Sequence, residues 1–440
     1  MPLFRRPMRI RWWIFGFTLA FPMLSYIQRL SAQDLAGTIM PSLHVNQLEI
    51  GWLATAFTTA YALAQLPGGI FSQRFGARWA LVVVGTLGVI ATLAFPSAPM
   101  ILTGTALFGT LLLAQALLGL SQGPLFPAAL AVIESWIPAN RWAMAGGMQA
   151  AAMNFGGAVT PLLVALLSRS FGWQGALLWI ALPVALLTLA WGWYGRDTPR
   201  EHAAVTPDEI AELGSGAAEA ARPPTARRLL KLLSDRNVLL LSLSYLCMNY
   251  AYYLLCFWAY LYLVQIRHFS GIEGGMAGAL PWIGAGLGAA AGGFISDRLA
   301  ERIGVRWGYR LVPLLALPVA GILLLVTLRV ATPYAAVATL AAAFFMVEIT
   351  EGAYGAAVMQ VARTDVAAAF GVLNTGGNVG GIIAQPIMGF LTNGGAWGVA
   401  FMSGTVFALI AAALWLVIDP ERLAELESRP VSVIRKAASA

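Results

Sequence analysis

Charge is scarce in this chain. Only 11% of its 440 residues are Asp, Glu, Lys or Arg, and 59% are hydrophobic. A soluble domain carries about a quarter charged residues. The composition therefore excludes an ordinary soluble multidomain protein and predicts a polytopic membrane protein.

Cysteine and histidine are also rare. Cys247 and Cys256 lie nine residues apart in one apolar segment, on different faces of a helix, so we expect no disulfide. His44, His202 and His268 are scattered over loops and segment ends, which excludes a histidine-based metal site or catalytic cluster. No phosphate-binding glycine–lysine loop supports an ATP-driven pump, and no extra soluble domain supports a sensor. We expect no enzyme activity, no metal and no cofactor.

Long apolar segments are what the sequence has instead. Each is long enough to cross about 30 Å of hydrocarbon as a helix. The twelve segments are 12–40, 50–73, 78–97, 102–136, 142–168, 172–195, 237–266, 273–297, 308–328, 333–361, 366–392 and 396–418. The sequence thus predicts an all-α membrane protein with twelve transmembrane helices in the lipid bilayer.

The net charge of +7 is a matter of topology. If both termini are cytoplasmic, every Lys and Arg lies in a cytoplasmic segment except Arg29, Arg169, Arg267 and Arg329. The positive-inside rule therefore predicts a multi-pass protein of the cell (inner) membrane with both termini in the cytoplasm. This placement explains the basic charge without a nucleic-acid partner.

A polar segment divides the chain into two sets of six spans. It holds two adjacent prolines, Pro223 and Pro224, and the stretch TPDEIAEL (206–213), which predicts a short capped helix. The predicted domains are an N-terminal six-helix bundle (1–196), a cytoplasmic linker (197–236), a C-terminal six-helix bundle (237–418) and a cytoplasmic tail (419–440).

The two halves resemble each other at a fixed offset. GGIFSQR (68–74) returns as GGFISDR (292–298), 224 residues later. At the same offset Gly147, Asn154, Gly156 and Gly157 return as Gly371, Asn378, Gly380 and Gly381. Duplicated halves around a central site are typical of alternating-access transporters, whereas single glycines would indicate only close helix packing. The repeat therefore predicts two pseudo-symmetric bundles.

These motifs resemble a known superfamily. GGIFSQRFGAR and GGFISDRLAERIGVR are similar to the loop signature of the major facilitator superfamily, although Gln73 replaces the acid that Asp297 keeps. SYIQR (25–29), GLSQGPLFPAALAVIESWIP (119–138) and DTPREHAAVTPDEI (197–210) resemble the anion:cation symporter family of sugar-acid and organic-anion permeases. The superfamily resemblance covers nearly the whole chain, and the family resemblance rests on these short motifs.

Arg29 is the first candidate for a functional residue. Only uncharged residues separate it from Arg11, and a guanidinium is costly inside hydrocarbon. One interpretation is an arginine at a helix end that snorkels to the headgroups, although Asp34 lies beyond it. The other is a buried cation that binds a carboxylate through two parallel hydrogen bonds. The resemblance favours the second, because the matching arginine of the sugar-acid permeases binds substrate carboxylate.

Three ionisable positions of the resembled family are glutamines here. The family usually has an acid before this arginine and another in span four, both implicated in proton coupling; these positions are Gln28 and Gln122. Gln115 stands where an arginine is often found. The proton pathway of the family therefore does not transfer to this N-terminal half, although Gln115 and Gln122 share a helix face and can line a cavity as neutral groups.

Carboxylates appear in the other half. Glu348 and Glu351 lie near the middle of span ten, three residues apart, and Glu351 resembles a repeat counterpart of Gln122, at an offset of 229 instead of 224 residues. Intramembrane acids are functional candidates by default, and two like charges so close favour the protonated form of one of them. We predict Glu351 as a proton carrier influenced by Glu348. The alternative is that one acid pairs with Arg29 or caps a helix break.

Further polar residues are weaker candidates for the cavity. Aromatic residues in spans are more often packing or interface residues than parts of a site. The full set of predicted substrate-binding residues is Gln28, Arg29, Tyr61, Gln65, Gln122, Gln149, Asn249, Tyr253, Asn374 and Asn378. The loop-signature residues predicted to form cytoplasmic gate contacts are Arg74, Arg78, Asp297 and Arg298.

The expected function is secondary active transport by alternating access. We expect a monomer that imports a small organic anion, such as a sugar acid, together with protons. A drug or metabolite exporter on the same fold is the nearest alternative. An anion uniporter or exchanger also stays open, because the N-terminal acids are missing.

Overall fold

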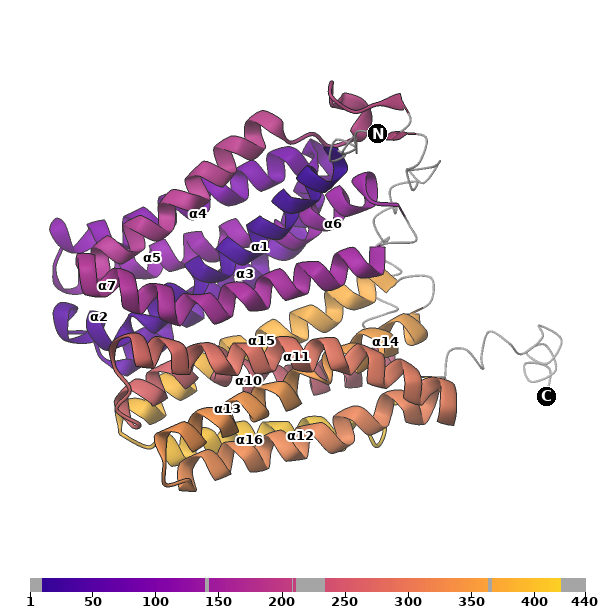
Figure 1. Ribbon diagram of the computed structural model, residues 1–440. Coiled ribbons are helices and arrows are strands. Elements are labelled where there is room, and N and C mark those ends of the chain that lie inside the picture. Colours follow the sequence, from indigo (N-terminus) through magenta and orange to yellow (C-terminus); the bar gives the residue numbers. More distant parts are fainter. Residues whose placement is uncertain (1–9, 139–141, 208, 211–233, 363–365, 421–440) are drawn as a thin grey trace, which may run out of the picture. The chain divides into compact units, whose positions relative to one another are not determined.

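The computed structural model consists mainly of long helices (Figure 1). It describes residues 10–138, 142–207, 209–210, 234–362 and 366–420. Within these ranges every regular element is helical, so the all-α prediction is confirmed. Half of the stretch 206–213, for which the sequence predicts a short helix, lies outside the described residues.

Within each part of the chain the helices follow one another with short connections. In the first part of the chain they are α1 (Ile10–Asp34), α2 (Ala36–Leu43), α3 (Gln47–Phe75), α4 (Ala77–Ser97), η1 (Ala98–Met100), α5 (Gly104–Gln122), α6 (Leu125–Trp136), α7 (Trp142–Tyr194) and η3 (Pro199–Glu201). The second part contains α10 (Arg236–Gln265), α11 (Gly271–Ile303), α12 (Val305–Arg329), α13 (Pro333–Glu348), α14 (Glu351–Ala362), α15 (Val366–Asn393) and α16 (Trp397–Leu414).

Twelve of the described segments have membrane length. Nine described helical segments are both long and apolar enough to cross a bilayer. One of them is α7, which contains two spans because Gly172 has a non-helical φ of 70° in its middle. Helices α3 and α15, of 29 and 28 residues, complete the set. The number of spans predicted from the sequence is confirmed.

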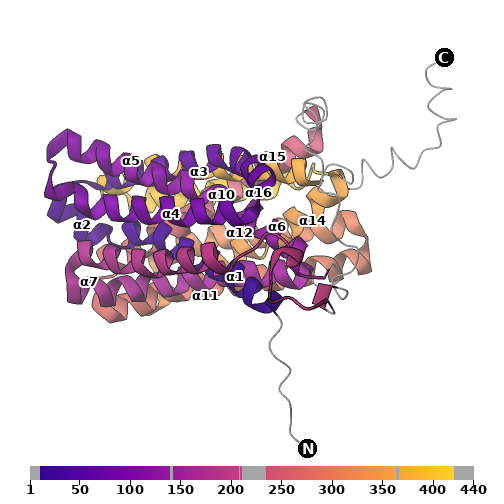
Figure 2. The same cartoon turned by 90° about the horizontal axis from the view of Figure 1, so that it is seen from above.

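Two compact units make up the chain. The N unit comprises Met1–Arg222 and Tyr260–Ile283, and the C unit comprises Pro223–Ala259 and Gly284–Ala440. Within the N unit, α1 and α4 pack along α7, and α3 packs along α5 (Figures 1 and 2). Within the C unit, α12 packs against α13 and α16. The bundle boundaries at 196 and 237 stay a prediction.

Spans four and ten each contain an interruption that the sequence did not predict. A turn at Gly123 and Pro124 separates α5 from α6, because proline has no amide hydrogen for the helix ladder. A turn at Ile349 and Thr350 separates α13 from α14, and the Thr350 hydroxyl there donates to the Val347 carbonyl at 2.7 Å. The repeat thus places a break in the same span of each half.

Small residues of the repeat pack directly on these breaks. A Cβ added at Gly68 of α3 would lie 2.6 Å from the Pro124 ring. Its partner in the repeat, Gly292 of α11, would place a Cβ 2.0 Å from the Ile349 carbonyl oxygen. Both distances are too short for a side chain. Glycine at this repeated position therefore lets α3 and α11 approach the interruptions of spans four and ten closely.

Candidate functional site

Aromatic rings surround Arg29 in the N unit. Only one residue, Leu35 in a right-handed helical conformation, separates α1 from α2, so Arg29 lies well inside span one. Its side chain is 3% exposed. The guanidinium carbon lies 5.3, 4.9 and 5.2 Å from the ring centroids of Tyr26, Phe57 and Tyr61. At such distances a cation is attracted to the ring faces, and these three residues are called the ring cage below.

The cage is itself held by neighbouring contacts. Phe57 and Tyr61 are one turn apart on α3 and stack with centroids 6.0 Å apart. A side-chain hydrogen bond joins Tyr61 to Gln65 one turn further on. Tyr26 meets the Trp282 ring of α11 edge to face at 5.9 Å, within the same unit. Predicted residues Arg29, Tyr61 and Gln65 are thus brought together on α1 and α3.

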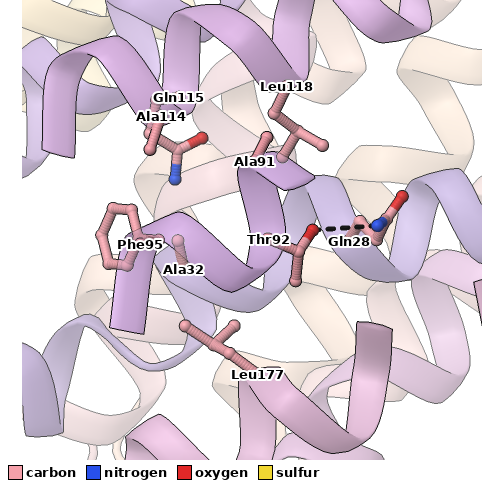
Figure 3. Close-up of a pocket in the computed structure, with 9 residues that line it drawn as sticks. All are labelled: Gln28, Ala32, Ala91, Thr92, Phe95, Ala114, Gln115, Leu118 and Leu177. Atoms are coloured by element: carbon pink, nitrogen blue, oxygen red, sulfur yellow. Dashed lines mark hydrogen bonds between the residues drawn. The ribbon is translucent and has the colours of Figure 1, made fainter. Parts of the chain in front are cut away.

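Gln28 lies in a different environment from Arg29. Its Nε2 donates to the Thr92 hydroxyl of α4 at 2.9 Å. Both residues line a small cavity of about 10 Å³ inside the N unit, with Gln115 of α5 opposite (Figure 3). Consecutive helix positions point about 100° apart, so Gln28 faces α4 while Arg29 faces α3. Gln28 as a substrate ligand stays a prediction, with its amide bound to Thr92.

The other two predicted glutamines are buried at helix contacts. Gln122, the last residue of α5, donates from Nε2 to the Ser25 carbonyl of α1 at 3.0 Å. Gln149 is buried on α7. The Gln122 bond ties the interrupted span four to span one, one turn before Arg29. The glutamine therefore supports the segment that carries the cage.

The acid pair of the C unit lies across the interruption of span ten. Glu348 ends α13 and Glu351 begins α14. Glu348 is 5% exposed, and the two carboxylates interact electrostatically. The Tyr245 hydroxyl of α10 donates to Glu351, 3.1 Å from Oε1 and 3.3 Å from Oε2. Glu351 also lies in the first turn of α14, where the helix dipole favours a negative charge.

On α10, Asn249 and Tyr253 follow Tyr245 by one and two turns, and α15 contributes two more neutral polar residues. Asn249 donates to the Tyr245 carbonyl at 3.0 Å. The Tyr253 hydroxyl donates to Oδ1 of buried Asn378 at 3.1 Å. Asn374, the other predicted residue of α15, is exposed. Of the six predicted polar residues of the C-terminal half, the structure thus brings Glu348 and Glu351 together and pairs Tyr253 with Asn378.

Glycines of α15 make these contacts possible. A Cβ added at Gly377 would lie 2.6 Å from the Tyr245 ring, and one at Gly381 would lie 2.5 Å from the Tyr253 ring. The glycine-rich segment LNTGGNVGG therefore places the α15 backbone directly against two aromatic rings of α10. Gly381 belongs to the repeat seen in the sequence, where it pairs with Gly157.

The loop signatures form matching corners, one in each unit. Gly76 between α3 and α4 and Gly304 between α11 and α12 have nearly the same φ and ψ, 89° and 151° against 88° and 155°. The Arg78 amide donates to Asp197 Oδ1 at 2.7 Å, just after α7. Arg306 forms an ion pair with Asp419 at 3.6 Å, just after α16. Each corner is thereby fastened to the end of the last span of its half.

The remaining predicted gate residues make local contacts. Arg78 donates from its guanidinium to the Gly192 carbonyl as well. Arg74 stacks on Phe75 and Arg298 on Phe294. Asp297 interacts with Tyr309 of α12. These contacts lie within single units, and the gate role of the four residues stays a prediction.

The sequence analysis missed several residues of both sites. Tyr26 and Phe57 complete the cage, and Thr92 binds Gln28. Tyr245 precedes Asn249 and Tyr253 at intervals of four, so one helix face already carried it. Asp197 and its counterpart lie in the similar stretches RDTPRE and IDPERL, which was a readable repeat signal. No group of three His, Cys, Asp or Glu that could hold a metal occurs among the described residues.

Comparison with known proteins gives the family. The family model described as Major Facilitator Superfamily matches residues 12–364, with a second match at 286–437. A probable sulfoacetate transporter of Cupriavidus necator is 27% identical over 427 residues, which cover 94% of this chain and 95% of the relative. The hexuronate transporter of Bacillus subtilis is 25% identical, with coverage of 89% and 90%.

A solved structure shows the same fold. The crystal structure of a bacterial homolog of the human lysosomal transporter Spinster superposes with a TM-score of 0.73 at 16% identity, covering 93% of this chain and 96% of that one. This shared fold agrees with the membrane-length helices described above. Because the family model matches more than half of the residues, this chain belongs to the Major Facilitator Superfamily and is a membrane transport protein.

Proposed function

We propose that this protein imports a small organic anion by alternating access, and that Arg29 binds the anionic group. The observation that carries the proposal is the ring cage. It holds a guanidinium, which stays charged, at a buried position well inside span one. A guanidinium can bind a carboxylate or sulfonate through two parallel hydrogen bonds, so it suits an anionic group.

The other buried arginines support the choice of Arg29. In the described residues, Arg11 and Arg310 are the remaining buried arginines. Arg11 forms an ion pair with Glu209 at 3.7 Å. Arg310 donates to the Ile418 carbonyl at 2.6 Å. Both lie near the beginning of their helices, whereas Arg29 lies well inside span one, at the depth expected of a substrate-binding cation.

The charges favour a monoanion over a dianion. The candidate residues comprise one cation, two acids and several neutral amides and hydroxyls. Among the described residues a second anionic group on the substrate would meet no second buried cation well inside a span, while amides and hydroxyls suit the hydroxyl groups of a sugar acid. Among the relatives, a hexuronate transporter acts on such a monoanion. We therefore propose a hexuronate-like monocarboxylate as the substrate class.

Proton coupling is assigned to Glu351. Coupling needs a group that gains and loses a proton, and the N-terminal candidates Gln28, Gln115 and Gln122 have none to exchange. The structure surrounds Glu351 with Glu348 and the Tyr245 hydroxyl. The neutral N-terminal residues also keep an anion exchanger open as a second candidate, since an exchanger needs no proton carrier. Import requires the proposed orientation, with both termini in the cytoplasm of the inner membrane, and a monomer suffices.

The experiment is uptake into proteoliposomes with an imposed pH gradient. The panel contains radiolabelled glucuronate, galactarate and sulfoacetate, with choline as a cationic control. We expect saturable accumulation of glucuronate that an uncoupler abolishes, and weaker transport of the dianions. Accumulation of choline, or of none of the anions, would contradict the proposal.

A Glu351→Gln variant separates import from exchange. It mimics a permanently protonated carboxyl group, so gradient-driven accumulation should disappear while exchange of labelled for unlabelled substrate continues. Wild-type accumulation in this variant would show that Glu351 carries no proton. Loss of both activities would assign Glu351 a structural role instead.

A further inference from the structure

The contact between Tyr245 and Glu351 is not explained by substrate binding. The hydroxyl lies almost equally far from the two carboxylate oxygens, at 3.1 and 3.3 Å. A phenol has one hydrogen to donate, so it can serve either oxygen of an ionised carboxylate. A hydrogen bond to an ionised group is about twice as strong as one between neutral groups. This geometry therefore favours the ionised state of Glu351 over its protonated state.

Contacts from two sides, α14 and α15, hold the Tyr245 ring. It meets the Tyr354 ring of α14 at 5.0 Å, edge to face. The Tyr354 hydroxyl pairs with the Ser244 hydroxyl at 2.6 Å, and Ser244 also donates to the Ala411 carbonyl of α16 at 2.8 Å. On the α15 side, Gly377 leaves no room between its backbone and the ring. The phenol is thus fixed in position before it meets the carboxylate.

Few titratable groups surround Glu351 in the described part of the C unit. Glu348 faces it from α13, Tyr245 from α10, and Tyr354 from α14 itself. From α11, Gly293 packs its backbone against Gly352. On the border of α11 and α12, Asp297 and Tyr309 interact with each other. From α15 the neighbour is Gly377. The hydrogen-bond donor acting on the Glu351 carboxylate is Tyr245, and Glu348 is the neighbouring carboxyl group.

We propose that Tyr245 is a positioning residue that sets the pH at which Glu351 exchanges its proton, by donating to the ionised carboxylate from a ring locked between α14 and α15. The proposal rests on the proposed role of Glu351 as the proton carrier. Tyr245 keeps its own hydrogen throughout. By stabilising the ionised carboxylate, it favours release of the proton from Glu351.

The test is the pH profile of gradient-driven glucuronate uptake by Tyr245→Phe. The ring contacts remain and only the donor is lost, so Glu351 should keep its proton to higher pH. We expect the midpoint of the profile to move upward by about one pH unit, the change that the loss of one charge-assisted hydrogen bond gives. Tyr250→Phe is the matched control. Tyr250 lies on the same helix and bonds Ser403 at 2.9 Å, so its midpoint should not move.

Two further variants separate the possible failures. In a Glu351→Gln background, Tyr245→Phe should leave the pH dependence of exchange unchanged, because the responsive group is gone. If Tyr245→Phe does not fold, Gly377→Ala moves the ring without removing the hydroxyl, and it should shift the midpoint in the same direction. Coincident profiles of Tyr245→Phe and wild type overturn this proposal, even where Glu351→Gln abolishes accumulation and the proposed function stands. Full accumulation by Glu351→Gln overturns the carrier assignment itself.

Discussion

Arg29→Lys tests the substrate contact most directly. Lysine keeps the positive charge in the ring cage, and its ammonium still benefits from the three aromatic faces within 5.3 Å of the guanidinium carbon. What it loses is the planar fork, because an ammonium binds a carboxylate as a point charge. The variant therefore separates charge from bidentate geometry.

The size of the effect follows from one lost hydrogen bond. A hydrogen bond to a charged group contributes about 1.5–3 kcal/mol. Since about 1.4 kcal/mol corresponds to a tenfold change in affinity, we expect KM for the anion to rise roughly 10- to 150-fold. Burial of Arg29 to 3% exposure means that water does not easily replace the lost bond.

The assay is the concentration dependence of glucuronate uptake by purified protein in proteoliposomes. Arg169→Lys is the control, because Arg169 is exposed at the kink of α7 and should keep the wild-type KM. Quantitative gel filtration in detergent shows that both variants are folded. If Arg29→Lys transports with the wild-type KM, the anion does not bind through two parallel hydrogen bonds to Arg29, and the reasoning fails.

Three further predictions concern packing, the inner pocket and topology. Gly157→Ala should lower the free energy of unfolding by about 1–3 kcal/mol, because the new Cβ would lie 2.4 Å from the Trp282 ring. Gly147→Ala is the control, because its Cβ meets open space and should leave that free energy unchanged. Thermal unfolding in detergent measures both variants. Gln115→Met should leave that free energy unchanged or raise it by about 1 kcal/mol, since Oε1 of this buried amide has no hydrogen-bond partner among the described residues; a clear loss of stability would show that the amide is needed. A reporter fused after residue 215 should be accessible only from the cytoplasm, and periplasmic labelling there would contradict the proposed orientation.

The sequence predicts the spans well because hydrophobic length is a local property. It does not predict the interruptions of spans four and ten. Gly123 and Pro124 can be accommodated in a kinked helix, and Thr350 interrupts its helix through a bond to Val347 that many threonines of intact helices also form. Local composition therefore does not distinguish a broken span from a bent one.

The sequence predicts the charged residues of the site but not the aromatic residues that contact them, for a related reason. Arg29 and Glu351 stand out because a charge in an apolar segment is rare. Phe57 does not, since an aromatic ring in a span is ordinary until a guanidinium lies over it. Tyr245 acts on a residue 106 positions away, and this contact depends on how closely α10, α14 and α15 approach. Such closeness is decided by Gly377, whose importance appears only once its neighbours are known.

Replacing the glycine has a different cost at each of the two loop corners. Gly76 and Gly304 share a backbone conformation that is open almost only to glycine and costs a side chain about 1–3 kcal/mol. At Gly304 that strain is the whole cost, because an added Cβ meets open space. At Gly76 the Cβ would also lie 2.3 Å from the Asp197 carboxylate. After a duplication, selection would thus conserve glycine in the first copy of the corner and tolerate substitutions in the second. A library of all substitutions, selected for transport, should retain only glycine at position 76 and keep some alanine at position 304.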